Sequence, residues 1–185
     1  MPRLHKLVFK LAFLGVTALL LTGAVPGNPE ECKEGSSDEK ILSACTAYID
    51  SGQYKGKDLA FAFYLRAIAH GNFEETDKAQ ADITKAMELD PGNAQFYFVR
   101  GNIQWATGSA ERNEQAVLPD YAKAISLKPD SALYFVSRCY AYAALREAQP
   151  KKAVPDCKKA LELDPENENA AALLQQVEEG AKAAP

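Results

Sequence analysis

One ten-residue pattern occurs three times in this chain, and it constrains the fold more than any other feature. Its copies are DITKAMELDP at 82–91, DYAKAISLKP at 120–129 and DCKKALELDP at 156–165. Apolar residues in each copy recur at the spacing of an amphipathic helix. Each copy closes on a proline, which lacks a backbone N–H and disfavours helical geometry in the residue before it. The sequence therefore predicts the same helix ending three times, which is typical of a repeat protein.

An arginine followed by a small residue precedes each copy inside an apolar helical run. The pairs are Arg66-Ala67, Arg100-Gly101 and Arg138-Cys139, and they stand 25, 29 and 27 residues before the closing proline. In this arrangement the chain resembles the tetratricopeptide repeat (TPR) family, whose units of about 34 residues are helix–turn–helix hairpins. The resemblance places Ala67, Gly101 and Cys139 at the eighth position of the unit, and Pro91, Pro129 and Pro165 at the thirty-second.

The resemblance implies an all-α, right-handed TPR solenoid of three repeats, with an N-terminal half-repeat and a C-terminal capping helix. The expected TPR domain is 36–180, with the half-repeat at 36–52, repeats at about 58–93, 94–131 and 132–167, and the capping helix at 169–180. An irregular lead-in at 25–35 and a frayed tail at 181–185 flank it. Pro119 and Pro155 are expected to delay or kink their helices. β-branched runs of period two, which would indicate strands, are absent from the sequence.

The first 24 residues predict a cleaved signal peptide. Arg3, Lys6 and Lys10 precede an apolar run at 11–21, and small residues follow it at 22–24. The alternative is an N-terminal membrane anchor, for which the run is short, since a spanning helix needs about 20 apolar residues. Cleavage would leave 18 Lys and Arg against 25 Asp and Glu, a net charge of −7. We therefore expect a periplasmic or secreted protein that binds neither nucleic acid nor, once cleaved, a membrane.

If the chain is exported, its four cysteines are expected to form disulfide bonds, because disulfides persist in oxidising compartments. Four cysteines allow three pairings, and local pairing is expected. In the TPR register, Cys139 and Cys157 face one another across a helix pair, and Cys32 and Cys45 repeat that arrangement at a separation of 13 residues. The alternative is that all four are reduced and serve as small core residues.

The TPR resemblance also implies a binding groove, because defined positions of the first helix of each unit line the concave face in that family. Carried over, the groove residues are Phe61, Tyr64, Ile68, Phe98, Asn102, Trp105, Val136 and Tyr140. Aromatic residues often anchor a bound protein segment. The alternative is that Phe61, Tyr64 and Phe98 only pack helix against helix. These positions lack the clustered Lys and Arg with which some TPR domains bind a terminal carboxylate.

Catalytic and metal sites are not expected, nor is a cofactor. His70 is the one histidine after residue 24, and the ligand spacings Cys-x-x-Cys and His-x-x-x-His do not occur. Asp82, Asp120 and Asp156 are expected to be exposed or capping residues near helix starts. The sequence thus favours a non-enzymatic, protein-binding adaptor or scaffold in the periplasm that captures a hydrophobic peptide or helix. Two alternatives remain open, namely a carrier of an apolar small molecule or lipid chain and a self-associating structural protein.

Overall fold

The computed structural model describes residues 29–106, 114–144 and 149–183, so the expected signal peptide at 1–24 lies outside the described residues. A short 3-10 helix, η1 (Pro29–Glu31), precedes α1 (Asp38–Asp50). The helices that follow are α2 (Gly56–Asn72), α3 (Thr76–Leu89), α4 (Ala94–Ala106), α5 (Glu114–Leu127), α6 (Ala132–Ala144), α7 (Pro150–Leu163) and α8 (Glu168–Ala183). The described residues contain no strand, and none of their helices is long and apolar enough to cross a membrane.

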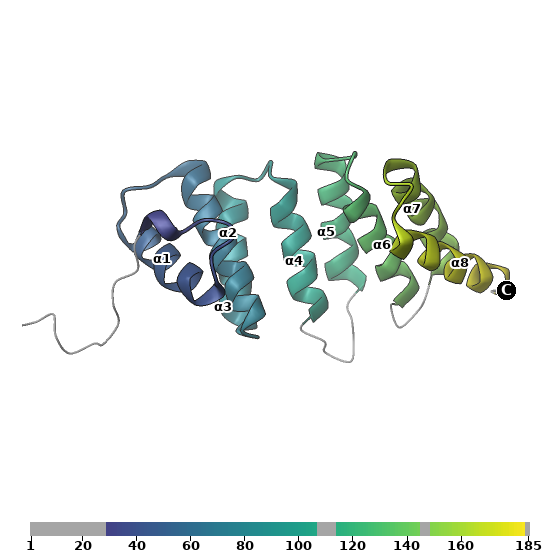
Figure 1. The fold of residues 1–185 in the computed structure, drawn as a ribbon, viewed down its shortest axis with the longest axis horizontal. Helices are drawn as coiled ribbons and strands as arrows, with labels where there is room; N and C mark the ends of the chain where they lie inside the picture. The colour runs from purple at the N-terminus through teal and green to yellow at the C-terminus, as the bar shows by residue number, and fades with distance from the viewer. Residues whose placement is uncertain (1–28, 107–113, 145–148, 184–185) are drawn as a thin grey trace, which may run out of the picture.

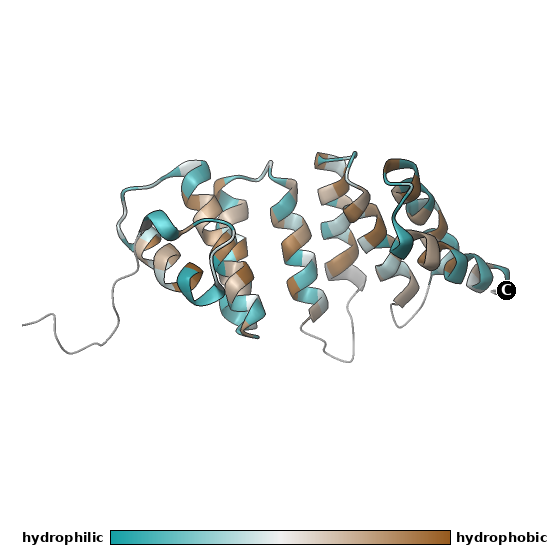
Figure 2. Ribbon diagram, viewed as in Figure 1, coloured by the Kyte–Doolittle hydropathy of each residue, from teal (hydrophilic) through white to brown (hydrophobic). Residues whose placement is uncertain are grey.

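The helices stand side by side in one elongated row, with α1 at one end and α8 at the other (Figure 1). The helices α2 and α3, α4 and α5, and α6 and α7 pack as pairs, and neighbouring pairs pack on one another. This arrangement confirms the predicted all-α, right-handed solenoid of three helix pairs, with a half-repeat before them and a single helix after them. Hydrophobic positions recur along both helices of each pair, whereas the turns are mostly hydrophilic (Figure 2).

The second helices of the three units have the same length and carry their aspartate at the same position. Each of α3, α5 and α7 has 14 residues, with its aspartate at the seventh position. Pro119 and Pro155 occupy the sixth position of α5 and α7, so the expected late helix start is wrong. The first N–H groups of a helix have no intrahelical partner, and a proline this close to the start removes only one early hydrogen bond. Each second helix therefore begins six residues before its aspartate, whether or not it contains a proline.

Small residues stand where the two helices of a unit touch. Ala67, Cys139 and the alanines Ala86, Ala124 and Ala160 are all fully buried, and Gly101 is buried at the position equivalent to Ala67. Side chains of this size allow close approach of the helix axes. Asparagines fix where two of the following helices begin, because Asn93 accepts a hydrogen bond from the N–H of Gln95 and Asn167 accepts one from Ala170.

The aspartates of the repeated pattern are buried, so the expectation that they are exposed or capping residues is wrong. Only 3–6% of their surface is exposed. Each carboxylate accepts two hydrogen bonds from the guanidinium of the arginine in the first helix, with an Nε–Oδ2 distance of 2.7 Å in all three units. The pairs are Arg66–Asp82, Arg100–Asp120 and Arg138–Asp156. A buried carboxylate needs such a partner, and the forked geometry of arginine supplies it.

The first of these ion pairs belongs to a larger polar network. Arg66 also donates to the hydroxyl of Thr46 on α1. His70 lies between two carboxylates, with Nδ1 2.6 Å from Glu75 and Nε2 3.8 Å from Asp82. The network joins α1, α2 and α3, which is a structural role for the histidine. Hydrogen bonds from Lys78 and His70 lower the pKa of the partly exposed Glu75 carboxyl.

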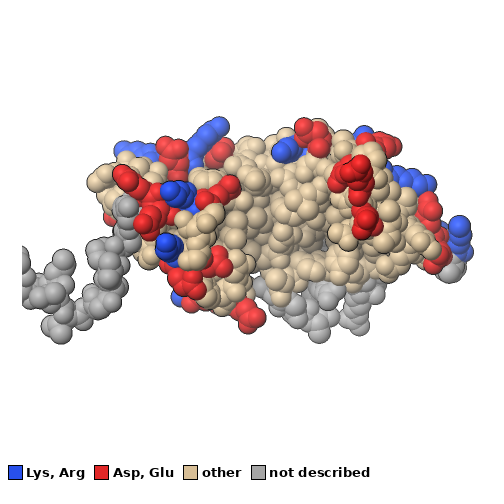
Figure 3. Space-filling view, viewed as in Figure 1, with Lys and Arg blue, Asp and Glu red and all other residues tan. Residues whose placement is uncertain are grey.

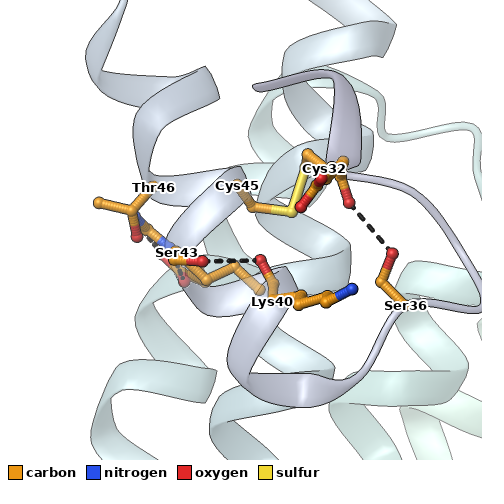
Figure 4. The surroundings of a disulfide bond; sticks show 9 residues. Cys32, Ser36, Lys40, Ser43, Cys45 and Thr46 are labelled. Carbon is orange, nitrogen blue, oxygen red and sulfur yellow. Dashed lines mark hydrogen bonds and ion pairs between the residues drawn. A yellow bond between two sulfur atoms is a disulfide. The ribbon is translucent and has the colours of Figure 1, made fainter. Parts of the chain in front are cut away.

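Both predicted cysteine pairs are joined by disulfide bonds in the structure. Cys32–Cys45 ties the lead-in to α1, with a Cα–Cα distance of 4.7 Å (Figure 4). Cys139–Cys157 joins α6 to α7, with a Cα–Cα distance of 5.5 Å. In the lead-in, the hydroxyl of Ser36 donates to the carbonyl of Glu31. The disulfide and this hydrogen bond fix the segment that precedes the first helix.

Candidate binding groove

A cavity of about 540 Å³ opens between α4, α5, α6 and α8. Its lining residues are Asn102, Trp105, Tyr121, Val136, Ser137, Tyr140, Asn169, Ala172, Leu173 and Gln176. All except Tyr121 come from α4, α6 and α8, which stand at corresponding places in successive units. We call this cavity the groove.

The groove contains four of the eight residues that the sequence analysis proposed, namely Asn102, Trp105, Val136 and Tyr140. The rings of Trp105 and Tyr140 meet edge to face, with their centroids 5.5 Å apart. Tyr140 is 50% exposed, which is unusual for a side chain of its size in this molecule. The two rings therefore form an aromatic corner that a bound molecule can reach.

The other four proposed residues do not line the groove. Tyr64 is buried, and its ring lies 5.5 Å from that of Phe61 and 5.3 Å from that of Phe96. Burial, together with the nearby Glu34 carboxylate, raises the pKa of Tyr64. Ile68 packs against the same N-terminal core cluster. At this end of the solenoid the ring of Tyr64 joins α2 to α4 through Phe96, and Phe61 packs on Tyr64 within α2.

Phe98 likewise packs against other aromatic side chains. Its ring centroid lies 4.9 Å from that of Tyr134 and 5.8 Å from that of Tyr121. These contacts connect α4 with α5 and α6, so the side chain bridges two units. Phe98 contacts the groove residue Tyr121 but does not line the groove itself.

The contribution of α8 was missed by the sequence analysis, which treated this helix as a cap. Asn169, Ala172 and Gln176 follow Pro165 by four, seven and eleven residues. Leu133, Val136 and Tyr140 follow Pro129 at the same distances. The helix α8 is thus the first helix of a fourth unit in register, and the signal that could have identified it was its distance from the closing proline.

None of the described residues that line the groove carries a charge. Three primary amides, three hydroxyls and an indole surround the apolar side chains of Val136, Ala172 and Leu173. Five lining residues are exposed, namely Asn102, Tyr140, Asn169, Ala172 and Gln176, so the groove is open to solvent. On the face shown in Figure 3, charged side chains gather over α1–α3 and over α7 and α8, and few lie over α4 and α5 between them.

One hydrogen bond within the groove orders its wall. The hydroxyl of Tyr121 donates to Oδ1 of Asn102 at 2.8 Å. Tyr121 is only 4% exposed, whereas Asn102 is exposed. Burial, with a smaller effect of the adjacent Asp120 carboxylate, raises the pKa of Tyr121 to about 12. The phenol therefore stays protonated at any physiological pH and remains a donor.

Metal ligands do not gather in the part of the chain that the structure describes, where no group of three His, Cys, Asp or Glu side chains could hold an ion. The ionisable side chains among the described residues that line the groove are those of Tyr121 and Tyr140. Its chemistry is that of hydrogen bonding and aromatic contact.

Comparison with known proteins agrees with this architecture. The family profile described as tetratricopeptide repeat matches residues 60–93 and 140–167. The heat shock protein sti1 homolog of Schizosaccharomyces pombe is 26% identical over 74% of this chain, and the match spans 24% of the length of that protein. The chain thus spans about a quarter of its curated relative.

Solved structures show the same fold. The first TPR domain of Spaghetti (RPAP3), bound to the HSP90 peptide SRMEEVD, is 22% identical, with a TM-score of 0.62 over 72% of this chain and 100% of that one. MamA is 17% identical, with a TM-score of 0.64 over 78% of this chain and 80% of that one. The second TPR domain of human RPAP3, in complex with an HSP70 peptide, is 21% identical, with a TM-score of 0.53 over 64% of this chain and 98% of that one. The chain thus carries tetratricopeptide repeats at 60–93 and 140–167, and its three helix pairs have the fold of the TPR structures that it resembles.

Proposed function

We propose that this protein is a non-enzymatic adaptor or scaffold that binds an uncharged segment of a partner protein in the groove of α4, α6 and α8. The observation that carries the proposal is the groove itself, which is open, uncharged and lined by an aromatic corner and three amides. Aromatic side chains supply most of the energy at many protein interfaces. Amides on both walls offer hydrogen bonds to the N–H and C=O groups of an extended peptide.

The peptide-bound RPAP3 domains support a peptide as the partner, but their peptides are acidic, whereas the segment proposed here is uncharged. The two RPAP3 domains are bound to HSP90 and HSP70 peptides, and both peptides end in the acidic sequence EEVD. The described groove residues here include no Lys or Arg that could pair with those carboxylates. An uncharged segment needs no counter-charge in this groove, whereas the carboxylates of an acidic segment would find none among the described lining residues.

A carrier of a lipid chain is less well supported than a peptide-binding adaptor. A lipid chain gains most from an enclosed apolar cavity. Here half of the lining residues are exposed, and seven of the ten bear a hydrogen-bonding group. Burial of an apolar chain against these groups would leave amides and hydroxyls without partners.

Export to the periplasm is part of the proposal. Two disulfide bonds in the described residues support an oxidising compartment. Fractionation of a Gram-negative host expressing the full chain should find the protein in the periplasm, shortened by the mass of residues 1–24. Full-length protein with free thiols in the cytoplasm would contradict this part of the proposal.

The sole tryptophan of the chain allows a direct test of the groove. Because Trp105 lines it, the intrinsic fluorescence should change when a pool of N-acetylated, C-amidated peptides made only of uncharged residues is titrated in. The acidic peptide SRMEEVD should cause no saturable change. Tyr140→Ala should weaken binding of the uncharged pool about tenfold or more.

The control variant is Phe73→Ala, because Phe73 is 43% exposed but does not line the groove. It should bind as the unaltered protein does. Equal binding by Tyr140→Ala, or tighter binding of the acidic peptide than of the uncharged pool, would reject the proposed groove. Saturable binding only of fatty acids would favour the carrier, and concentration-dependent light scattering without peptide would favour self-association.

A further inference from the structure

We infer that Tyr121 is a positioning residue that fixes the Asn102 amide with its N–H groups toward the groove, so that the groove selects a hydrogen-bond acceptor at this point. The inference rests on the proposed function, and it names what the groove recognises there. The acceptor is a backbone or side-chain carbonyl of an uncharged segment.

The position of Tyr121 depends on the glycine opposite it. A Cβ atom at residue 101 would lie 2.7 Å from Cε1 and 3.1 Å from Cδ1 of the Tyr121 ring. The ring therefore rests against the backbone of α4, in space that any other residue at 101 would occupy. From there its hydroxyl reaches the side chain of the next residue, Asn102.

The direction of the hydrogen bond determines what Asn102 can offer. A buried hydroxyl needs a partner, and the carbonyl oxygen Oδ1 of Asn102 lies 2.8 Å from it. Tyr121 is also packed with Val117 and Ala141 in a buried cluster, so the ring has little freedom to turn away. A phenol whose pKa is about 12 cannot become an acceptor-only phenolate near neutral pH.

A free asparagine amide can rotate to present either its oxygen or its nitrogen. With Oδ1 held by Tyr121, the nitrogen Nδ2 is left to face the groove, and it carries two N–H donors. Asn102 is exposed and lines the groove, so a ligand can reach these donors. A ligand group that only donates hydrogen bonds would find at Asn102 only the second lone pair of Oδ1, which already accepts from Tyr121.

Two substitutions test this arrangement with the uncharged, capped peptide pool as the probe. Tyr121→Phe keeps the ring and removes only the hydroxyl, so Asn102 becomes free to turn. We expect the affinity for the pool to fall about three- to tenfold. Asn102→Asp replaces the donors by a second acceptor, and the loss should be larger. The control is Tyr97→Phe, whose hydroxyl donates to the Pro91 carbonyl outside the groove and whose loss should leave binding unchanged.

The outcomes separate the two claims. If the unaltered protein binds no peptide of the pool, the proposed function fails. If it binds and both Tyr121→Phe and Asn102→Asp bind equally well, the inference fails and the proposed function stands. If Tyr121 had a purely structural role, Tyr121→Phe would lower the midpoint of thermal unfolding and leave the selectivity among peptides unchanged. Our inference instead predicts that Tyr121→Phe loses its discrimination against peptides in which one backbone carbonyl is replaced by a thioamide, a weaker acceptor.

A measurement without ligand keeps the inference testable in every case. In NMR relaxation experiments, the side-chain amide of Asn102 should have a high order parameter in the unaltered protein and a lower one in Tyr121→Phe. An equally mobile amide in both proteins would overturn the inference.

Discussion

Arg138 donates two hydrogen bonds to the carboxylate of Asp156, with both N–O distances at 2.7 Å, and the next residue of each helix is a cysteine of the Cys139–Cys157 disulfide. The hydrogen bonds also raise the pKa of the Arg138 guanidinium. The other two units have the same ion pair but no disulfide. At the positions of the cysteines, the first unit has Ala67 and Ile83, and the second has Gly101 and Tyr121.

The disulfide thus occupies a place where the other units pack a small residue against a large one. All four side chains concerned in the first and third units are fully buried. The ion pair fixes the helix register in every unit, and the adjacent contact can be made either by packing or by a covalent bond.

Replacing Cys139 and Cys157 by Ala and Ile, the residues of the first unit, should recover part of the stability lost on removing the disulfide. The bond closes a loop of 18 residues and should contribute roughly 3 kcal/mol to the free energy of unfolding. A Cys139→Ala/Cys157→Ala variant loses this and also leaves a cavity. Urea denaturation should therefore rank the parent first, the Ala/Ile variant second and the Ala/Ala variant last. Equal stability of the two variants would show that the site is not equivalent to that of the first unit.

The ion pairs should respond unequally to loss of one partner or the other. In the second unit, the Arg100 side chain is 29% exposed and that of Asp120 only 4%. Arg100→Ala leaves a buried carboxylate without its partner and should cost about 3–5 kcal/mol of unfolding free energy. Asp120→Asn leaves an arginine that water can reach and should cost about 1–2 kcal/mol. Urea denaturation of both variants checks the order.

The double variant Arg100→Met/Asp120→Leu is the control for this asymmetry, since it removes both charges and keeps apolar volume. It should be more stable than Arg100→Ala. A larger loss of unfolding free energy in Asp120→Asn than in Arg100→Ala would contradict this prediction. It would mean that leaving the arginine without its partner costs more than leaving the aspartate without its partner.

The helices could be predicted from sequence because their determinants are local. Apolar spacing and a closing proline act within one helix, and they recur three times. The Arg–Asp pairs could not be derived in the same way, because an aspartate at the seventh position of a helix is equally compatible with an exposed face. Its burial depends on the placement of a second helix. The constant position of both residues in three units was the available signal.

The predicted residues of α4 and α6 include four that line the groove, whereas the lining residues of α8 were not predicted and those proposed on α2 lie outside it. Trp105 and Tyr140 line it, whereas the ring of Tyr64 contacts those of Phe61 and Phe96. Helical spacing places all of these residues on corresponding faces. It does not show which face a neighbouring helix will cover, and that depends on the size of the side chains across the interface.

Gly101 and Gly71 should respond in opposite directions to the same substitution. Gly101→Ala drives a methyl group into the Tyr121 ring, at 2.7 Å from Cε1, and should cost about 1–3 kcal/mol despite the better helix propensity of alanine. At Gly71 the nearest atom to a new Cβ is Cγ1 of Ile103 at 3.9 Å, which is an ordinary contact. Gly71→Ala should therefore be neutral or stabilise by up to about 1 kcal/mol. Thermal denaturation measured side by side checks both, and a stabilising Gly101→Ala would contradict the close approach of Tyr121.

The buried phenol of Tyr121 should make stability depend on alkaline pH. Its pKa is raised from 10.0 to about 12 in the folded protein, mainly by burial. Between these values the unfolded chain has released the proton and the folded chain still holds it, so the unfolded state binds fewer protons and stability falls as the pH rises. The contribution is fully present below pH 10 and is lost as the pH rises to about 12, up to about 2–3 kcal/mol.

Tyr121→Phe is the matched variant, because it has no proton to release at this site. Burial also raises the pKa of Tyr64 and Tyr134, and these residues are common to both proteins. Denaturant titrations at a series of pH values should thus show a steeper loss of stability above pH 10 in the parent than in Tyr121→Phe. Parallel curves would mean that the Tyr121 hydroxyl is reached by water in the folded state, and the hydrogen bond to Asn102 would then not hold the amide in place.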